Sequence, residues 1–495
     1  VGTSAKYNGM GNVTISLQKN GINLGVFKNQ NIIWNGEAGY LASLASVPKV
    51  ASILDNGYWY NSYLEGGTMT IATNVNMDNG SSENIKGTDV FSDIVMEREK
   101  VTINPGVQII SDKGRGLVLG SNVVANTNGK NDASGYTNNG EIKIKGGNEA
   151  GVHVSYGHIK NNNFIETDGG IGALGVNGSR IENTNTGKIN IGTSDTVNGV
   201  GIVGLATKIK GDGTPDTPES YGTDAGDAVT KVLEIYNRGS IVVKGKSGVG
   251  IYAENNGTSV GKERTFVENT GSIIVGDSTI SNAAVGIYGD KTTISNQGNI
   301  TVGDEGVGIY AKNGTEVTNL GTLNLGTDGI GIVIDGTSTI TANSVTLAST
   351  EADINGKTGI FYKGSAAGTD SKNINLNINA SDFVKGTTIY AENMNITSSG
   401  DLNIGKEGIG IFVKGSSSNI GTNSGTINLT SGKTGAVGMY TKTANILNST
   451  GGIINVNDSS QIGMYAEGNN NSAVNTGVIN LKVDGSTGIY VKSGA

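Results

Sequence analysis

Hydrophobic and polar residues alternate along short stretches of the chain, with turn-forming residues between the stretches. In one of them Ile300 and Val302 fall on one side of an extended backbone, and Asn299 and Thr301 fall on the other. The aliphatic residues of 307–311 follow the same period of two. This period predicts β-strands with one buried face. The pattern therefore predicts many short strands separated by Gly, Asn and Asp turns.

Two phrases recur along the chain. One is Asn-x-Gly followed by alternating aliphatic residues, as in 296–302 (NQGNITV), and the other is Gly-aliphatic-aromatic, as in 308–310 (GIY). Copies of the second phrase, some weaker, begin at Gly116, Gly151, Gly201, Gly250, Gly286, Gly331, Gly359, Gly410, Gly438, Gly463 and Gly488. Complete or degenerate copies of the first lie near Asn139 and Asn183 and at Asn237, Asn269, Asn319, Asn423 and Asn475. A repeat of roughly 22–29 residues is the signature of a solenoid.

The repeat predicts the fold. Strands this short cannot bury their aliphatic face within one copy, whereas stacked copies can. We therefore predict an all-β, right-handed parallel β-helix with three short strands per coil. Parity places Ile309 inside and Tyr310 outside, beside Gly308, which leaves room for the rings to lie flat; an inward Tyr column is the alternative. Asn296 shares the parity of inward residues, so the repeated asparagines are expected to stack as an internal amide ladder.

The repeat is uneven along the chain, which predicts three regions. Residues 1–100 form an irregular N-terminal β and helical region, with a short helix over 38–47. Residues 101–230 form a β-helix with loop insertions, among them an acidic loop over 210–227. Residues 231–495 form a regular β-helical rod. Because the last phrase stops in mid-coil, we expect a window cut from a longer polypeptide.

Composition narrows the class of protein. Gly occurs 80 times in 495 residues and Pro only 4 times, which is typical of β-turns and not of disorder or collagen. The net charge is −8 and the few Arg are spread singly, so the basic stripe that nucleic-acid binding needs is not predicted. Cysteine is absent, which suits export through an oxidising compartment or reflects a low-cysteine genome. No apolar run reaches the length of a membrane span.

Acidic residues recur after the first strand of the repeat, at Asp277, Asp304, Glu305, Asp328, Glu407, Asp458 and Asp484. A carboxylate row suits acid–base chemistry or Ca²⁺, so a β-helical polysaccharide lyase or hydrolase is the alternative class. Asp also forms turns through its own side chain, and a feature of every repeat is unlike a single active site. Asp212 and Asp216 have only a faint Ca²⁺-ligand spacing. We predict no catalytic residues, metal or cofactor, and we expect His153 to belong to the Tyr column.

One aromatic cluster lies in the irregular N-terminal region. It comprises Tyr58, Trp59, Tyr60 and Tyr63, and the other Trp, Trp34, is near it in sequence. Tyr and Trp carry much of the energy at protein interfaces, and rings can stack on sugars. These five residues are therefore the predicted ligand-binding residues. The alternative is that the rings anchor the N-terminal segment onto the solenoid.

The phrases 102–121, 248–253 (GVGIYA) and 296–303 (NQGNITVG) resemble those of the passenger regions of very large fusobacterial type V (autotransporter) outer-membrane adhesins. The resemblance covers roughly residues 100–495. It implies a virulence-associated protein on the bacterial cell surface, exported through a C-terminal β-barrel. Its partners would be a host-cell receptor or glycan, or a surface protein of a coaggregating bacterium. The short head repeats of trimeric autotransporters are missing, so a monomer is expected, and no family binding motif is matched.

Overall fold

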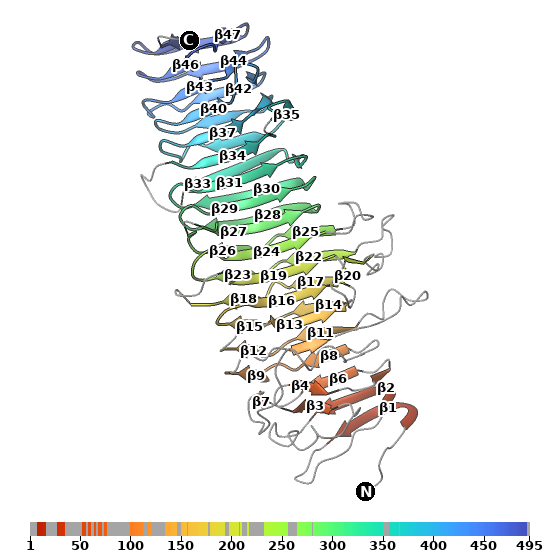
Figure 1. The fold of residues 1–495 in the computed structure, drawn as a ribbon. Coiled ribbons are helices and arrows are strands. Elements are labelled where there is room, and N and C mark those ends of the chain that lie inside the picture. The colour runs from red at the N-terminus through yellow and green to blue at the C-terminus, as the bar shows by residue number, and fades with distance from the viewer. Residues whose placement is uncertain are drawn as a thin grey trace. The chain divides into compact units, whose positions relative to one another are not determined.

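The computed structural model describes residues 232–492 except 256–264, 280, 350–355 and 366, most of 134–209, and short stretches elsewhere between 7 and 216. The chain forms two compact units, Val1–Ser272 and Ile273–Ala495. All regular elements among the described residues are strands, and in each unit parallel strands stack coil upon coil as a β-solenoid (Figure 1). The predicted all-β parallel β-helix is confirmed. The helix predicted over 38–47 lies outside the described residues.

The first unit begins with β1 (Tyr7–Ile15), which pairs in parallel with β2 (Phe27–Trp34). The same ladder continues through β6 (Thr68–Ile71) to β8 (Lys100–Ile103). Parallel pairing therefore extends upstream of residue 101, where the sequence predicted the β-helix to begin. The other strands of this part are β3 (Ser52–Asp55), β4 (Tyr58–Tyr60), β5 (Leu64–Glu65) and β7 (Val75–Asn76).

Downstream of β8 the first unit has three parallel ladders. One continues from β8 through β11 (Ser134–Asn138), β14 (Gly157–Asn161), β17 (Ser179–Asn183), β22 (Leu233–Asn237) and β25 (Thr265–Asn269). The next runs through β9 (Gln108–Ser111), β12 (Glu141–Ile144), β15 (Phe164–Thr167), β18 (Lys188–Ile191) and β23 (Ser240–Val243). The last runs through β10 (Leu117–Leu119), β13 (Ala150–Ser155), β16 (Ile171–Val176), β19 (Val200–Leu205) and β24 (Val249–Glu254). Within the predicted loop 210–227, the structure describes only β21 (Pro215–Asp216), antiparallel to β20 (Lys208–Ile209).

The second unit repeats this three-ladder arrangement, and β26 (Ser272–Val275) contains the boundary. The ladder formed by the Gly-aliphatic-aromatic phrase runs through β27 (Val285–Asp290), β29 (Val307–Lys312), β31 (Ile330–Asp335), β34 (Thr358–Lys363), β37 (Thr387–Glu392), β40 (Ile409–Lys414), β43 (Val437–Thr441), β46 (Ile462–Ala466) and β49 (Thr487–Val491). We call it the aromatic-phrase sheet. The second ladder comprises β28 (Thr293–Val302), β30 (Glu316–Leu325), β33 (Ser344–Ser349), β36 (Asn377–Ala380), β39 (Leu402–Ile404), β42 (Thr426–Leu429), β45 (Ile453–Val456) and β48 (Val478–Leu481), with the short β32 (Thr339–Ile340) beside β30. The third comprises β35 (Asp370–Ile374), β38 (Met394–Ser398), β41 (Ile420–Asn423), β44 (Asn445–Asn448) and β47 (Ala473–Asn475).

The predicted parity is confirmed for the aliphatic and aromatic residues. Ile300, Val302 and Ile309 are fully buried, whereas Thr301 and Tyr310 are partly exposed on the outer face. Each coil thus contributes Ile, Val, Leu or Ala to a continuous interior. Stacking of the coils buries these aliphatic side chains, which a single coil could not do.

The predicted internal amide ladder is also present. In the first unit each Asn Nδ2 donates to the Oδ1 of the equivalent Asn one coil further along, at 2.7–2.8 Å, through Asn138, Asn161, Asn183, Asn237 and Asn269. All five side chains are buried. In the second unit the same bonds, at 2.8 Å, join Asn423, Asn448 and Asn475. A buried amide must find partners inside the protein, and the stack supplies them.

The prediction that Asn319 belongs to this ladder is wrong. A register shift in the β28–β30 pairing aligns Asn319 with Ser295, and Asn296 with Leu320. Asn319 is exposed and its Nδ2 donates to the Ser295 hydroxyl at 3.0 Å. The Asn-x-Gly phrase gives the residue type, but the local pairing register decides which side of the strand the amide occupies.

The role predicted for the repeated glycine is also corrected. Gly308 is buried, and a Cβ placed on it would lie 2.6 Å from the Gly331 carbonyl oxygen. At Gly463 a Cβ would lie 2.6 Å from the Gly488 oxygen and 3.0 Å from the interior Ile479 Cγ2. The missing side chain therefore faces the interior and the next coil, and not the outer face beside the ring.

Candidate binding surface

The aromatic-phrase sheet of the second unit presents a column of rings on its outer face. Strand pairing aligns six of them in register on successive coils: Phe361, Tyr390, Phe412, Tyr440, Tyr465 and Tyr490. Neighbouring ring centroids are 4.8–5.2 Å apart, with interplanar angles from 15° to 45°. Val333 occupies the same column one coil before Phe361, and Tyr310 precedes Val333. We call the six aligned rings the ring ladder.

The ring ladder differs from the prediction that the rings lie flat. Coils repeat at about 4.8 Å along a parallel ladder, which is less than the width of an aromatic ring. The rings therefore tilt and stack partly face to face, an arrangement that contributes about 0.5–1.5 kcal/mol per pair. Their edges and Tyr hydroxyl groups, and not their faces, are turned to the surroundings. Stacking of a flat ligand on a ring face is correspondingly disfavoured along this ladder.

A column of charged residues runs beside the rings, two positions further along each strand. Opposite charges on neighbouring coils form ion pairs, with Lys414 Nζ 3.0 Å from Glu392 and Lys492 Nζ 3.2 Å from Glu467. Glu467 also accepts hydrogen bonds from the hydroxyls of Tyr440 at 2.6 Å and Tyr465 at 3.0 Å. The hydrogen bond from Tyr440, followed by those from Lys492 and Tyr465, lowers the pKa of Glu467 to about 2. Hydrogen bonds to Glu467 therefore connect the Tyr hydroxyls of the ring ladder to the charge column.

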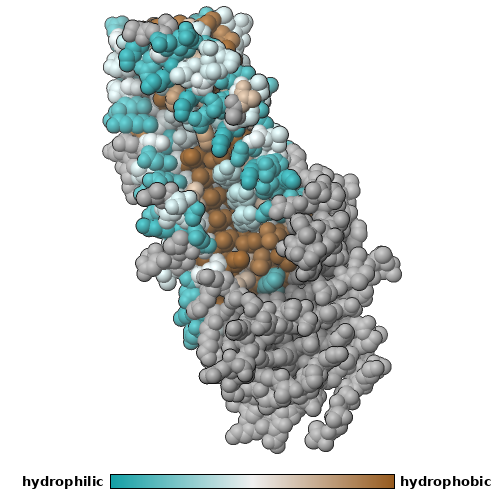
Figure 2. All heavy atoms as spheres, viewed as in Figure 1, coloured by the Kyte–Doolittle hydropathy of each residue, from teal (hydrophilic) through white to brown (hydrophobic). Residues whose placement is uncertain are grey.

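Apolar residues complete this unit's surface. Figure 2 shows a strip of hydrophobic residues on the visible face, bordered by hydrophilic ones. In the aromatic-phrase sheet, half-buried aliphatic residues such as Ile330, Ile409 and Ile462 begin the strands. Rings, aliphatic groups and charges therefore repeat together on one sheet, and the rings are of the residue types that are enriched in protein interfaces.

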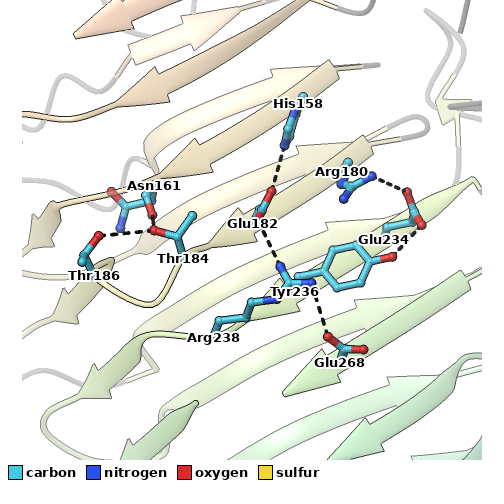
Figure 3. A network of polar contacts seen from close by, with 10 residues as sticks. All are labelled: His158, Asn161, Arg180, Glu182, Thr184, Thr186, Glu234, Tyr236, Arg238 and Glu268. Atoms are coloured by element: carbon cyan, nitrogen blue, oxygen red, sulfur yellow. Dashed lines mark hydrogen bonds and ion pairs between the residues drawn. The ribbon is translucent and has the colours of Figure 1, made fainter. Parts of the chain in front are cut away.

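The first unit contains a different polar cluster, drawn in Figure 3. The ring of Tyr236 lies 4.9 Å from the guanidinium carbon of Arg180 and 4.9 Å from that of Arg238. Arg238 bridges Glu182 at 3.0 Å and Glu268 at 3.5 Å. Sequence reasoning missed this cluster because the two arginines are far apart in the chain. Strand pairing of β17, β22 and β25 brings them onto one face.

Two further members extend the cluster at its edges. Glu234 is almost fully buried, lies 3.8 Å from Arg180 and accepts a hydrogen bond from the Tyr236 hydroxyl at 2.8 Å. His158 Nε2 lies 3.8 Å from Glu182. Each arginine and glutamate drawn in Figure 3 therefore has an opposite charge beside it. An internally paired cluster of this kind fixes the coils to one another and offers a ligand few free charges.

The predicted ligand-binding aromatics are placed in different elements. Trp34 ends β2 in the parallel ladder, where it aligns with Ile71. Tyr58, Trp59 and Tyr60 form β4, which pairs antiparallel with β3 in a separate two-stranded sheet. Tyr63 lies outside the described residues. The backbone therefore does not place Trp34 in the same sheet as the other three.

The acidic turn residues form backbone contacts between coils. Asp277 Oδ1 accepts the Asp304 N–H at 3.0 Å, and Asp304 Oδ1 accepts the Thr327 N–H at 2.7 Å. Asp458 Oδ2 accepts the Gly432 N–H at 2.6 Å. Glu305, which follows Asp304 in the same turn, and Asp328 and Glu407 in other turns have φ of 52–55°, in the left-handed region. These observations match the predicted turn-forming role of the acidic residues.

His153 occupies the predicted column position. It aligns with Val118 on one side and Leu174 on the other, and the column continues to Val203 and Tyr252. Burial lowers the pKa of its imidazole to about 4. Its Nε2 has no hydrogen-bond partner. The side chain is therefore a neutral, packed member of the column.

Among the described residues no group of three or more His, Cys, Asp or Glu side chains could hold a metal ion. Asp212 lies outside them, and Asp216 is in β21. No helix in the described part of the chain is long and apolar enough to cross a membrane.

Fold and surface together define the protein as a parallel β-helix with a repeated aromatic and charged outer face in its second unit. Comparison with protein-family models, with curated proteins and with solved structures found no match.

Proposed function

We propose that the chain is a passenger segment of a type V bacterial outer-membrane adhesin, and that it acts as a monomer on the cell surface. Its partner would be a host-cell receptor or glycan, or a surface protein of another bacterium. Two features support this proposal. The repeat phrases resemble those of fusobacterial adhesins, and the solenoid carries columns of aromatic and charged side chains on its outer face along many coils.

The observation that carries the proposal is the ring ladder with its charge column. Tyr is enriched where proteins meet partners, because it combines a large contact area with a hydroxyl group. A surface that repeats on successive coils offers many weak contacts, which add up when several engage at once. Attachment between two cell surfaces is a function that such multiplicity favours.

The test is attachment of protein-coated beads to host epithelial cells and to partner bacteria. Tyr440→Val and Tyr465→Val together should reduce attachment severalfold, and Val333 shows that this column accommodates Val. Asn455→Val with Asn480→Val, on the outward face of β45 and β48, is the matched control and should bind as the unchanged protein does. If the Tyr variant attaches as well as the unchanged protein, the ring ladder is not part of the binding surface.

The N-terminal aromatics remain a second predicted contact. Rings give a large contact area at low entropic cost, whereas a Pro- and Gly-containing loop such as 210–227 must be ordered on binding. Trp59→Ala with Tyr60→Ala should weaken attachment and leave the β-sheet circular dichroism unchanged. Deletion of 211–226 should matter less. If a fragment beginning at residue 230 attaches normally, both of these features are excluded.

We propose no enzymatic activity for this segment. The carboxylates of Asp277, Asp304 and Asp458 accept backbone N–H groups in turns, a structural use that supports this view. Incubation with polygalacturonate or alginate, with and without Ca²⁺, should release no unsaturated oligosaccharides. Release that Asp304→Asn abolishes would favour a β-helical polysaccharide lyase instead.

A further inference from the structure

The charge column beside the ring ladder alternates in sign from coil to coil with one exception. In the second unit it reads Asp290, Lys312, Asp335, Lys363, Glu392, Lys414, Lys442, Glu467 and Lys492. Each step joins opposite charges except the one from Lys414 to Lys442. A surface that otherwise repeats therefore contains one feature that occurs once.

The two lysines of this step lie on adjacent coils. Val413 and Thr441 are paired across β40 and β43, and the lysines are the next residue of each coil. Adjacent strands are about 4.8 Å apart. Each ammonium group has an acidic neighbour on its far side only: Lys414 Nζ is 3.0 Å from Glu392, and Lys442 Nζ is 4.0 Å from Glu467. No carboxylate of the column separates the two cations.

Both ammonium groups can be reached from solvent, since the side chains of Lys414 and Lys442 are 55% and 65% exposed. Like charges opposite each other on neighbouring strands destabilise a sheet. An anion placed between them would relieve that repulsion and gain two charge-assisted contacts. The Glu392–Lys414 and Lys442–Glu467 pairs lie on the two outer sides of this step, and Lys414 also hydrogen-bonds Tyr390. An ammonium group has three hydrogens, so each lysine keeps at least one to donate to a ligand.

The neighbouring rings add an apolar contact to the step. The centroids of Phe412 and Tyr440 are 4.8 Å apart, and Phe412 presents an edge without a hydroxyl group. The Tyr440 hydroxyl is already occupied by Glu467. A ligand at this place meets two cations beside an apolar ring edge. A carboxylate attached to a sugar ring matches this arrangement, because its C–H groups can contact the ring edges while its carboxylate bridges the ammonium groups.

We propose that Lys414 and Lys442, with the edges of Phe412 and Tyr440, bind the carboxylate of an acidic sugar. The biological use of this site rests on the proposed adhesive function, for which it names the ligand class as acidic glycans. The site occurs once in the column, so it supplies selectivity that the uniform ring ladder lacks. Its affinity depends on charge, and salt weakens it, because both lysines are exposed.

The chain provides a closely matched control site. Phe361 and Lys363 on β34 have the same spacing as Phe412 and Lys414 on β40. The next coil offers Tyr390 in place of Tyr440, and Glu392 in place of Lys442. The two places therefore differ chiefly in the sign of one charge.

The experiment titrates the whole protein with 3′-sialyllactose, and with lactose as the neutral probe, and follows binding by isothermal calorimetry or ligand-observed NMR. Sialyllactose should bind and lactose should not. Lys442→Gln should weaken binding at least about tenfold, and Lys442→Glu should abolish it. Lys363→Gln should leave it unchanged. Circular dichroism of each variant establishes that the β-solenoid is intact.

Two results would overturn the proposal. One is a failure of the unchanged protein to bind sialyllactose, or equal binding of lactose. The other is binding that Lys442→Glu leaves intact or that Lys363→Gln weakens as much as Lys442→Gln. Oligogalacturonate, a carboxylated glycan without sialic acid, distinguishes the two kinds of acidic glycan. Binding of both probes indicates recognition of the carboxylate in general. Binding of sialyllactose alone indicates a sialylated ligand. If the protein binds sialyllactose but coated beads do not attach to cells, the acidic-sugar site is supported and the proposed adhesive function is contradicted.

Discussion

The two units hold their coils in register with different side-chain stacks. The first unit has a buried amide ladder of five asparagines from Asn138 to Asn269, while its outer column contains unlike residues such as His153 and Val203. The second unit has the ring ladder outside, and two amide ladders are described in it. One has three members, from Asn423 to Asn475, and an outward one joins Asn403, Asn428, Asn455 and Asn480. A parallel stack aligns like side chains wherever the sequence repeats. The comparison teaches that a solenoid can use this alignment on either side of its wall.

The location of the stack decides what it is free to do. A buried amide ladder must satisfy its own donors and acceptors, so it contributes to stability and nothing else. An outer ladder of rings also stabilises neighbouring coils, but its edges remain available to a partner. The first unit's outer cluster around Tyr236 has opposite charges side by side, whereas the second unit's charge column contains one step between like charges, at Lys414 and Lys442. We therefore place the ring-ladder contact and the proposed acidic-sugar site, but not the N-terminal aromatic contact, in the second unit.

The largest effect is expected from breaking the buried amide ladder in its middle. Asn183→Leu removes the acceptor of Asn161 Nδ2 and the donor to Asn237 Oδ1, both of which are buried. Each of these two groups loses its buried amide partner, which costs 1–3 kcal/mol, so the free energy of unfolding should fall by about 4 kcal/mol. Chemical denaturation followed by circular dichroism measures it. Asn190→Leu, on the partly exposed face of β18, is the control, and an equal loss in both would contradict the ladder's role.

The second effect depends on pH. His153 has a pKa of about 4 in the folded protein and about 6.5 when unfolded, so the unfolded chain binds the proton more readily. With respect to this group the folded protein has its full stability above pH 6.5. The free energy of unfolding then falls by up to about 3 kcal/mol as the pH is lowered toward 4. His153→Leu should flatten the unfolding free energy over this window. A pH profile unchanged by the substitution would show that other groups govern it.

The smallest effect is a gain in the second unit. Ser398 aligns with Asn423, but its hydroxyl is too short to continue the ladder, and Asn423 Oδ1 has no hydrogen-bond partner. Ser398→Asn should supply the missing donor and raise the unfolding free energy by about 1 kcal/mol. Thr397→Asn, on the partly exposed face of the same strand, should give no gain. A loss at Ser398 would mean that the site has no space for the amide.

Part of the surface was predictable and part was not. The spacing of Tyr440 and Tyr465 in the repeat predicted an outward column, since parity fixes the face of a strand. Their tilted stacking was not predicted, because it follows from the distance between coils, which a strand pattern does not contain. The like-charge step follows only once strand pairing aligns Lys414 with Lys442. The predicted Trp34 and Tyr58–Tyr60 site was reasoned from local composition, which cannot indicate that they belong to different sheets.

The sequence by itself determined the fold class, the burial of residues such as Ile309, and the existence of an internal Asn ladder, because alternation and repetition are properties of the chain. Tertiary structure alone decided which residues become neighbours across coils. Strand pairing places Arg180 and Arg238 beside Tyr236. Asn161 and Asn448 belong to the amide ladder although neither begins an Asn-x-Gly phrase, and Asn319 begins one but does not belong to the ladder. The physical reason is that coils vary in length. Register between coils, and not distance along the sequence, determines which side chains meet.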